Sequence, residues 1–144
     1  MQTRINFFKV APQAYNALME LSKFIGTTSL DPIHQELIKI RASQINGCAF
    51  CINMHTNEAR KNGETEQRLY LLSAWREADV FTNAEKALLA FTEEVTLISS
   101  HVSDETYANA AKYFDEKYLS DILMMIIIIN SWNRMAIATG LRVA

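Results

Sequence analysis

The sequence predicts an all-α protein, and three observations carry that prediction. No stretch of five or more residues alternates apolar and polar side chains, which is the pattern of a half-buried strand. The chain has only four Gly and two Pro, too few for a turn-rich β fold. Apolar residues instead recur at helical spacing between capping and terminating residues. We expect about seven helices, after an extended arm at residues 1–10, in one domain spanning residues 1–144.

Proline and glycine mark the first two helices. Pro12 suits the first turn of a helix and Gly26 suits its end, with apolar residues at helical spacing between them. Asp31 is a typical N-cap, and Pro32 after it suits the first helical position, so the second helix is expected to begin there. An Asn-Gly pair at Gly47 should end this helix.

Turn and capping signals also delimit the three middle helices. The third is expected to begin near Cys48 and to end near Asn62, which a glycine follows. A fourth should run from about Thr65 to Trp75 on the spacing of its leucines. The fifth begins with Thr-Asn-Ala-Glu at residues 82–85, a capping box that satisfies two backbone N–H groups of the first turn.

The last two helices follow from serine caps and a terminal glycine. Ser103 opens the sixth helix, whose apolar stripe reaches Phe114, and Ser120 opens the seventh, which Gly140 ends. Residues 122–129 of the seventh helix are all apolar, but eight residues are far fewer than the ~20 that span a bilayer. We therefore expect a core helix that is buried on all sides.

The composition is that of a soluble globular protein without a charged partner. Hydrophobic residues make up 49% and charged residues 21%, and the net charge is −2 with no cluster of Lys or Arg. We expect no nucleic-acid partner and no membrane partner. The first residues show no secretory signal, so a cytoplasmic protein is expected. In that compartment a cysteine pair is more often catalytic or metal-binding than a structural disulfide.

The only two cysteines lie in one motif at the start of the third helix. Cys48 and Cys51 are three positions apart and His55 follows four positions later, so all three side chains share one helix face. Unpaired N–H groups in the first turn favour a thiolate, and a neighbouring imidazole can accept the thiol proton. The other cysteine can then attack the oxidised sulfur and close a local disulfide. The motif predicts a redox-active thiol pair.

Glu36 is a candidate partner for the imidazole. It lies in the preceding helix, at the border of the apolar stripe, where a glutamate taken alone is normally solvated. A hairpin at Gly47 would fold that helix against the cysteine helix and let Glu36 reach His55. Carboxylate, imidazole and thiol would then form a proton relay.

Zinc binding is an alternative use of the same side chains. Cys48, Cys51 and His55 would give three ligands, and His34 or His101 could supply a fourth. Structural zinc sites usually draw ligand pairs from separate segments, and three ligands on one short stretch of helix fit a tetrahedron poorly. Two thiols packed in the core are a further alternative. We expect neither a metal nor a cofactor.

The stretch from Glu36 to His55 resembles the core of the AhpD-like alkylhydroperoxidases, which belong to the wider carboxymuconolactone decarboxylase family. The family pattern is a glutamate, a CxxC pair beginning twelve residues later, and a histidine four residues after the second cysteine. Phe50 departs from the best-known AhpD proteins, which carry a second histidine there, and is similar to shorter single-domain members. The resemblance covers most of the chain and continues through residues 75–78, 81–88 and 130–134.

The resemblance implies an AhpD-like helical fold, assembled into trimers or hexamers, and the activity of a thiol peroxidase in antioxidant defence. It implies that Cys51 reacts with a small hydroperoxide, while Cys48 is the proton donor and resolving thiol. His55 and Glu36 would be the proton relay, and a lipoyl or thioredoxin-like dithiol protein would be the reductant. Helix position alone favours Cys48 as the more acidic thiol. Contact with His55 and the resemblance favour Cys51, which we expect to react first.

Two other functions are open to the same sequence. A lyase like the carboxymuconolactone decarboxylases would not depend on the cysteine pair, and a non-enzymatic oligomer could respond to redox state by changing its assembly. A homo-oligomer is also expected because seven helices with 49% hydrophobic residues leave more apolar surface than one small domain covers. Trp75, Phe50 and Trp132 are candidates to cover the cysteines.

Overall fold

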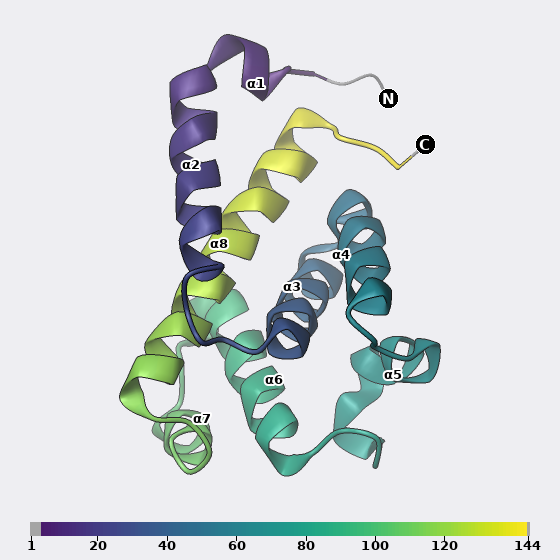
Figure 1. Cartoon of the computed structure of the whole chain (residues 1–144), viewed down its shortest axis with the longest axis vertical. Helices are drawn as coiled ribbons and strands as arrows, with labels where there is room; N and C mark the ends of the chain where they lie inside the picture. The colour runs from purple at the N-terminus through teal and green to yellow at the C-terminus, as the bar shows by residue number, and fades with distance from the viewer. Residues whose placement is uncertain (1–3, 144) are drawn as a thin grey trace.

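The structure, a computed structural model, describes residues 4–143, and within that range it contains helices and loops but no strand (Figure 1). The all-α prediction is therefore confirmed. The described residues form eight α-helices and two short 3₁₀ helices rather than seven helices. The elements are α1 (Phe7–Val10), α2 (Pro12–Ile25), α3 (Pro32–Asn46), α4 (Ala49–Lys61), α5 (Glu66–Leu71), η1 (Leu72–Glu77), α6 (Asn83–Thr96), η2 (Ile98–Ser100), α7 (Asp104–Ala110) and α8 (Glu116–Thr139).

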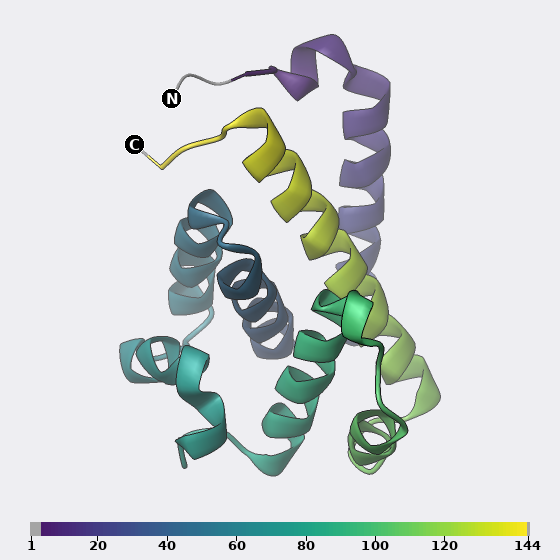
Figure 2. The ribbon, with the colours of Figure 1, turned by 180° about the vertical axis from the view of Figure 1, so that it is seen from behind.

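The central helix of the fold is α3, which packs against α4, α6 and α8. The long helix α8 crosses the molecule, and α2 and α6 both pack against it (Figure 1, Figure 2). Helix α7 packs on α6. The core between these helices is aliphatic, because α3, α6 and α8 each contribute fully buried side chains. These include Leu37, Ile38 and Ile40 of α3, Leu88 and Leu89 of α6, and Ile122, Ile126 and Ile129 of α8.

Most of the predicted caps have the expected geometry. The Asp31 carboxylate accepts the backbone N–H of Ile33 at 2.7 Å, and Pro32 occupies the first position of α3. Thr82 and Glu85 form the capping box, each side chain accepting the other residue's backbone N–H. These contacts fix where α3 and α6 begin.

Glycines end three of the helices by two different geometries. Gly47 and Gly140 end α3 and α8 in the left-handed conformation, with φ of 70° and 77°. Gly26 ends α2 as predicted, but in the right-handed region with φ of −64°. The left-handed turn at Gly47 reverses the chain between α3 and α4, which is the hairpin that the cysteine site needs.

The N-terminal prediction is wrong for residues 7–10, which form α1 instead of an extended arm. The Asn6 side chain accepts the N–H of Lys9 at 3.1 Å, so it caps this short helix. The Phe8 ring packs edge-to-face on Tyr15 of α2, with ring centroids 5.3 Å apart. Residues 1–3 of the predicted arm lie outside the described residues.

The start of the last helix was also predicted wrongly. The helix begins at Glu116, because the Asp115 side chain accepts the N–H of Tyr118 at 2.8 Å and acts as the cap. Ser120 and the aspartate after it, taken from the sequence as the cap, lie inside α8. Asp121 there is buried and forms an ion pair with Lys117 at 2.5 Å.

The prediction that residues 122–129 are buried on all sides is wrong as well. Leu123 and Ile127 are 39% and 44% exposed, while the side chains between and around them are largely buried. By length and composition α8 could cross a membrane, but half of its most apolar window is buried inside the fold, as in a core helix of a soluble protein. We therefore interpret α8 as a core helix with one uncovered apolar stripe.

A buried polar network joins α3 to α8 just before the turn at Gly47. The Asn133 side-chain amide donates to the Ser43 hydroxyl at 2.9 Å, and its carbonyl accepts from the Asn46 amide at 2.9 Å. Asn46 also donates to Asn130 at 3.0 Å. Because every member has a partner, the network fixes the C-terminal end of α3 against α8. It thereby sets where the cysteine helix begins.

Candidate functional site

Cys48 and Cys51 are brought together at the start of α4, as predicted. Cys48 is the N-cap residue, and its sulfur accepts the backbone N–H of Cys51 at 3.3 Å. The two sulfurs are joined as a disulfide, and both residues are only 2% exposed. The pair therefore occurs as a local disulfide at a helix N-terminus, where unpaired N–H groups and the helix dipole favour a thiolate after reduction.

Glu36 and His55 also meet, across the α3–α4 hairpin. The Glu36 Oε2 and His55 Nδ1 atoms lie 3.2 Å apart. They are not aligned as a hydrogen bond, and neither atom has another hydrogen-bond partner among the described residues. Glu36 is buried rather than solvated, which the sequence alone did not favour. With Nδ1 facing Glu36, Nε2 is the ring nitrogen of His55 that is left for another partner.

Lys39 is a member of the site that the sequence analysis missed. Its ammonium contacts the second carboxylate oxygen of Glu36 at 2.5 Å. Burial alone would raise the pKa of Glu36, but the contacts with His55 and Lys39 outweigh burial and hold that pKa below its ordinary value of 4.5. Glu36 is therefore an anion at neutral pH. The i,i+3 spacing of Glu36 and Lys39 on one helix was the signal available in the sequence.

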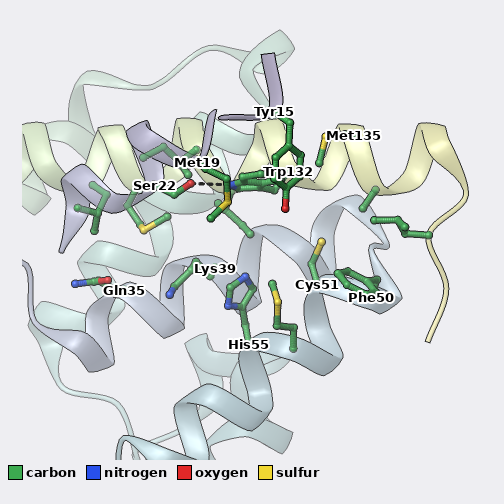
Figure 3. Close-up of a pocket in the computed structure, with 17 residues that line it drawn as sticks. Tyr15, Met19, Ser22, Gln35, Lys39, Phe50, Cys51, His55, Trp132 and Met135 are labelled. Atoms are coloured by element: carbon green, nitrogen blue, oxygen red, sulfur yellow. Dashed lines mark hydrogen bonds between the residues drawn. The ribbon is translucent and has the colours of Figure 1, made fainter. Parts of the chain in front are cut away.

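A cavity of about 470 Å³ lies between α2, α3, α4 and α8, and it reaches the cysteine site (Figure 3). Cys51 and His55 line it, but Cys48 and Glu36 do not. Its walls are mainly apolar, as in pockets that take small organic molecules. The other lining residues are Tyr15, Met19, Ser22, Ile25, Gln35, Lys39, Phe50, Met54, Met125, Ile128, Ile129, Trp132, Met135, Ala136 and Leu141.

Of the three aromatic residues expected to cover the cysteines, two line this cavity and one lies in the core. Phe50 and Trp132 line the cavity, and the Trp132 indole N–H donates to Ser22 at 2.8 Å, which fixes the ring (Figure 3). Trp75 does not line it. The Trp75 indole N–H donates to the carboxylate of Glu93 at 2.8 Å, away from the cysteines, and the ring is buried.

The two other histidines lie away from the cysteines. His34 is half-buried, and its Nδ1 contacts the Tyr118 hydroxyl at 2.7 Å. The same hydroxyl accepts the Asp31 N–H at 3.0 Å. Burial lowers the pKa of His34. His101 is exposed in a loop, and within residues 4–143 no three His, Cys, Asp or Glu side chains are grouped to hold a metal ion.

Comparison with known proteins gives consistent matches over the chain. The model of the carboxymuconolactone decarboxylase family matches residues 12–94. The uncharacterized protein YdfG of Bacillus subtilis is 47% identical over 145 residues, covering 100% of this chain and 99% of YdfG. A crystal structure from Agrobacterium tumefaciens, of a protein of unknown function named with the AhpD antioxidant defence proteins, is 38% identical with a TM-score of 0.97. That alignment covers 99% of each chain.

A more distant structure shares the fold only. The debrominase Bmp8, solved with a bound tribromopyrrole, is 21% identical with a TM-score of 0.85. The alignment covers 93% of this chain and 72% of Bmp8. The same helical arrangement therefore carries more than one chemistry, so a function for this chain has to be argued from its own site.

Proposed function

The chain belongs to the carboxymuconolactone decarboxylase family, and on that premise we propose that it is a thiol-dependent peroxidase that reduces hydroperoxides through Cys48 and Cys51. One observation carries the proposal. Cys51 and His55 face a single apolar cavity, and the buried Glu36 carboxylate stands behind the imidazole. A nucleophilic cysteine requires a base that accepts the thiol proton and an anion that stabilises the protonated base.

The first step of the proposed cycle oxidises Cys51. His55 accepts the Cys51 thiol proton, and the Glu36 anion stabilises the resulting imidazolium. The thiolate attacks the terminal oxygen of the hydroperoxide, the O–O bond breaks, and the departing alkoxide takes up a proton. The products are a sulfenic acid on Cys51 and an alcohol.

The second step closes the disulfide, and the third reopens it. The Cys48 thiol attacks the Cys51 sulfur and releases water, a short path because the pair already spans one helical turn. A dithiol protein, lipoyl or thioredoxin-like, then gives two electrons and two protons to the pair and leaves as its own disulfide. This cycle belongs in a reducing cytoplasm, in antioxidant defence.

The site supports this proposal better than the two alternatives. A decarboxylating lyase has no use for a disulfide-forming pair beside its base, whereas the peroxidase uses both. A redox-responsive structural disulfide needs neither a cavity at Cys51 nor a buried carboxylate behind His55. The proposed substrates are organic hydroperoxides, because the lining is mainly aliphatic, aromatic and thioether.

The proposal is tested by stopped-flow consumption of cumene hydroperoxide by the reduced protein, followed by mass spectrometry of the peptide that holds both cysteines. We expect one equivalent of peroxide to be consumed and an intramolecular Cys48–Cys51 disulfide to form. Protein left in the disulfide form is the control and should consume none. If the reduced protein consumes no peroxide and both thiols stay free, the peroxidase proposal is wrong and lactone decarboxylation is the next assay.

We also propose that the protein is a homo-oligomer, a trimer or a hexamer. The exposed stripe of α8 supports this, since Leu123, Ile127 and Ile137 are 39%, 44% and 45% exposed. Large side chains lined up on one helix are typical of a surface that a second copy covers. Light scattering of the reduced protein at micromolar concentration should give at least three times the 16.4 kDa chain mass. A monomer mass would contradict this proposal without touching the chemistry.

A further inference from the structure

The Tyr15 hydroxyl is a polar group that the proposed cycle does not use. The residue lies on α2, far in the sequence from the cysteine motif, and lines the same cavity as Cys51 and His55. Figure 3 shows its hydroxyl pointing from the α2 side into the cavity, toward the wall formed by α4. Among residues 4–143 no hydrogen bond to this hydroxyl is found, so the donor is free to bind a ligand atom.

The Tyr15 ring is held in place although its hydroxyl is free. Its faces and edges meet Phe8 and Trp132 in edge-to-face contacts, with centroids 5.3 Å and 5.5 Å apart. Trp132 is itself fixed by its hydrogen bond to Ser22. Because the ring is already fixed, the hydroxyl needs little reorganisation to donate a hydrogen bond to an incoming acceptor. The three contacts therefore preorganise the hydroxyl.

Other polar side chains of the lining already have partners. Lys39 donates to Glu36, Gln35 to the Leu30 carbonyl, and Ser22 to the Leu18 carbonyl. His55 faces Glu36 through Nδ1 and is assigned to the Cys51 proton. An oxygen that enters this apolar space next to Cys51 therefore meets in the Tyr15 hydroxyl a donor with no partner among residues 4–143, whereas Lys39 and Gln35 are already held by Glu36 and the Leu30 carbonyl.

We propose that Tyr15 is a further catalytic residue that donates a hydrogen bond to the oxygen that leaves when Cys51 attacks a hydroperoxide. This inference rests on the proposed function. As the Cys51–O bond forms and the O–O bond breaks, negative charge develops on the leaving alkoxide oxygen. Tyr15 stabilises that charge and keeps its own proton, while the proton taken from Cys51 through His55 completes the alcohol.

The test is Tyr15→Phe, which removes the hydroxyl and keeps the ring contacts. We expect the second-order rate of Cys51 oxidation by cumene hydroperoxide to fall about 100- to 1,000-fold, the order for a donor to a developing oxyanion. The loss should be much smaller with peracetic acid, whose leaving carboxylate needs less stabilisation. A variant that merely disturbs the cavity would lose rate equally with both peroxides. Tyr113→Phe, an exposed tyrosine outside the cavity, is the matched control.

A binding measurement separates this inference from the proposed function. Cumyl alcohol and cumene differ by one hydroxyl, and the fluorescence of Trp132 in the cavity wall reports their binding to the disulfide form. We expect Tyr15→Phe to weaken the binding of cumyl alcohol about 5- to 10-fold, as for one neutral hydrogen bond, and to leave cumene binding unchanged. If wild-type protein consumes no peroxide, the proposed function fails, while this comparison still decides whether Tyr15 donates a hydrogen bond to an oxygen bound in the cavity. Equal alcohol affinity in both proteins would overturn the inference.

Discussion

Replacing Cys51 by serine should lower hydroperoxide consumption at least about 1,000-fold, to the background rate. The reason is that a serine hydroxyl stays protonated where a thiol ionises, and Cys51 is the cysteine that lines the cavity. Cys48 is equally buried but does not line that cavity. Stopped-flow measurement with cumene hydroperoxide checks the result, and the size-exclusion elution volumes of wild type and variant serve as a folding control.

The partner variant Cys48→Ser should behave differently, because it keeps the attacking thiol and loses the resolving one. It should consume one equivalent of peroxide and then stop, with a sulfenic acid trapped on Cys51. Labelling with dimedone and mass spectrometry of the Cys51 peptide detect that product. The opposite pattern, in which Cys48→Ser is inert and Cys51→Ser carries the sulfenic acid, would assign the first attack to Cys48.

The cysteine site was predictable from the sequence because its geometry is local. Helical spacing predicts that Cys48, Cys51 and His55 share one face, and Cys51 and His55 do line one cavity. Cys48 is the N-cap residue just before α4 and meets Cys51 through the disulfide. The contact of Glu36 with His55 followed from one turn, the left-handed Gly47 between two consecutive helices. The chemical roles of these residues stay predictions, since the variants above are what test them.

The opposite wall of the cavity was not predictable in the same way. Tyr15 and Trp132 meet across more than a hundred residues of chain, and no local spacing rule brings α2 against α8. The start of α8 was misplaced for a related reason. A serine-aspartate pair at Ser120 looks like a cap from its composition, but Asp115 upstream had already satisfied the first turn.

Glu36→Gln should slow Cys51 oxidation about 100-fold while leaving the fold intact. Glutamine keeps the size of the side chain but lacks the charge that stabilises a protonated His55, and general-base assistance is commonly worth this order. The rate is measured with cumene hydroperoxide as for the wild type. Glu85→Gln is the matched control, because Glu85 is also a buried carboxylate in an ion pair, with Arg68 at 2.5 Å, whereas the carboxylate that lies against His55 is that of Glu36.

The pH dependence of stability in Glu36→Gln and Glu85→Gln, compared with their peroxidase rates, distinguishes a catalytic effect from a loss of stability. The pKa values of Glu36 and Glu85 both lie below the ordinary 4.5. Burial raises both, but contacts with His55 and Lys39 outweigh it for Glu36, and contacts with Arg68 and Thr82 outweigh it for Glu85. A carboxyl group with a lowered pKa stabilises the fold fully above its unfolded pKa, and that contribution is lost as pH falls through the folded pKa. Each variant should therefore be less stable than wild type to urea at neutral pH, with the gap narrowing below about pH 4.5. Only Glu36→Gln should also lose peroxidase rate; an equal rate loss in Glu85→Gln would mean that lost stability, not the relay, explains the effect.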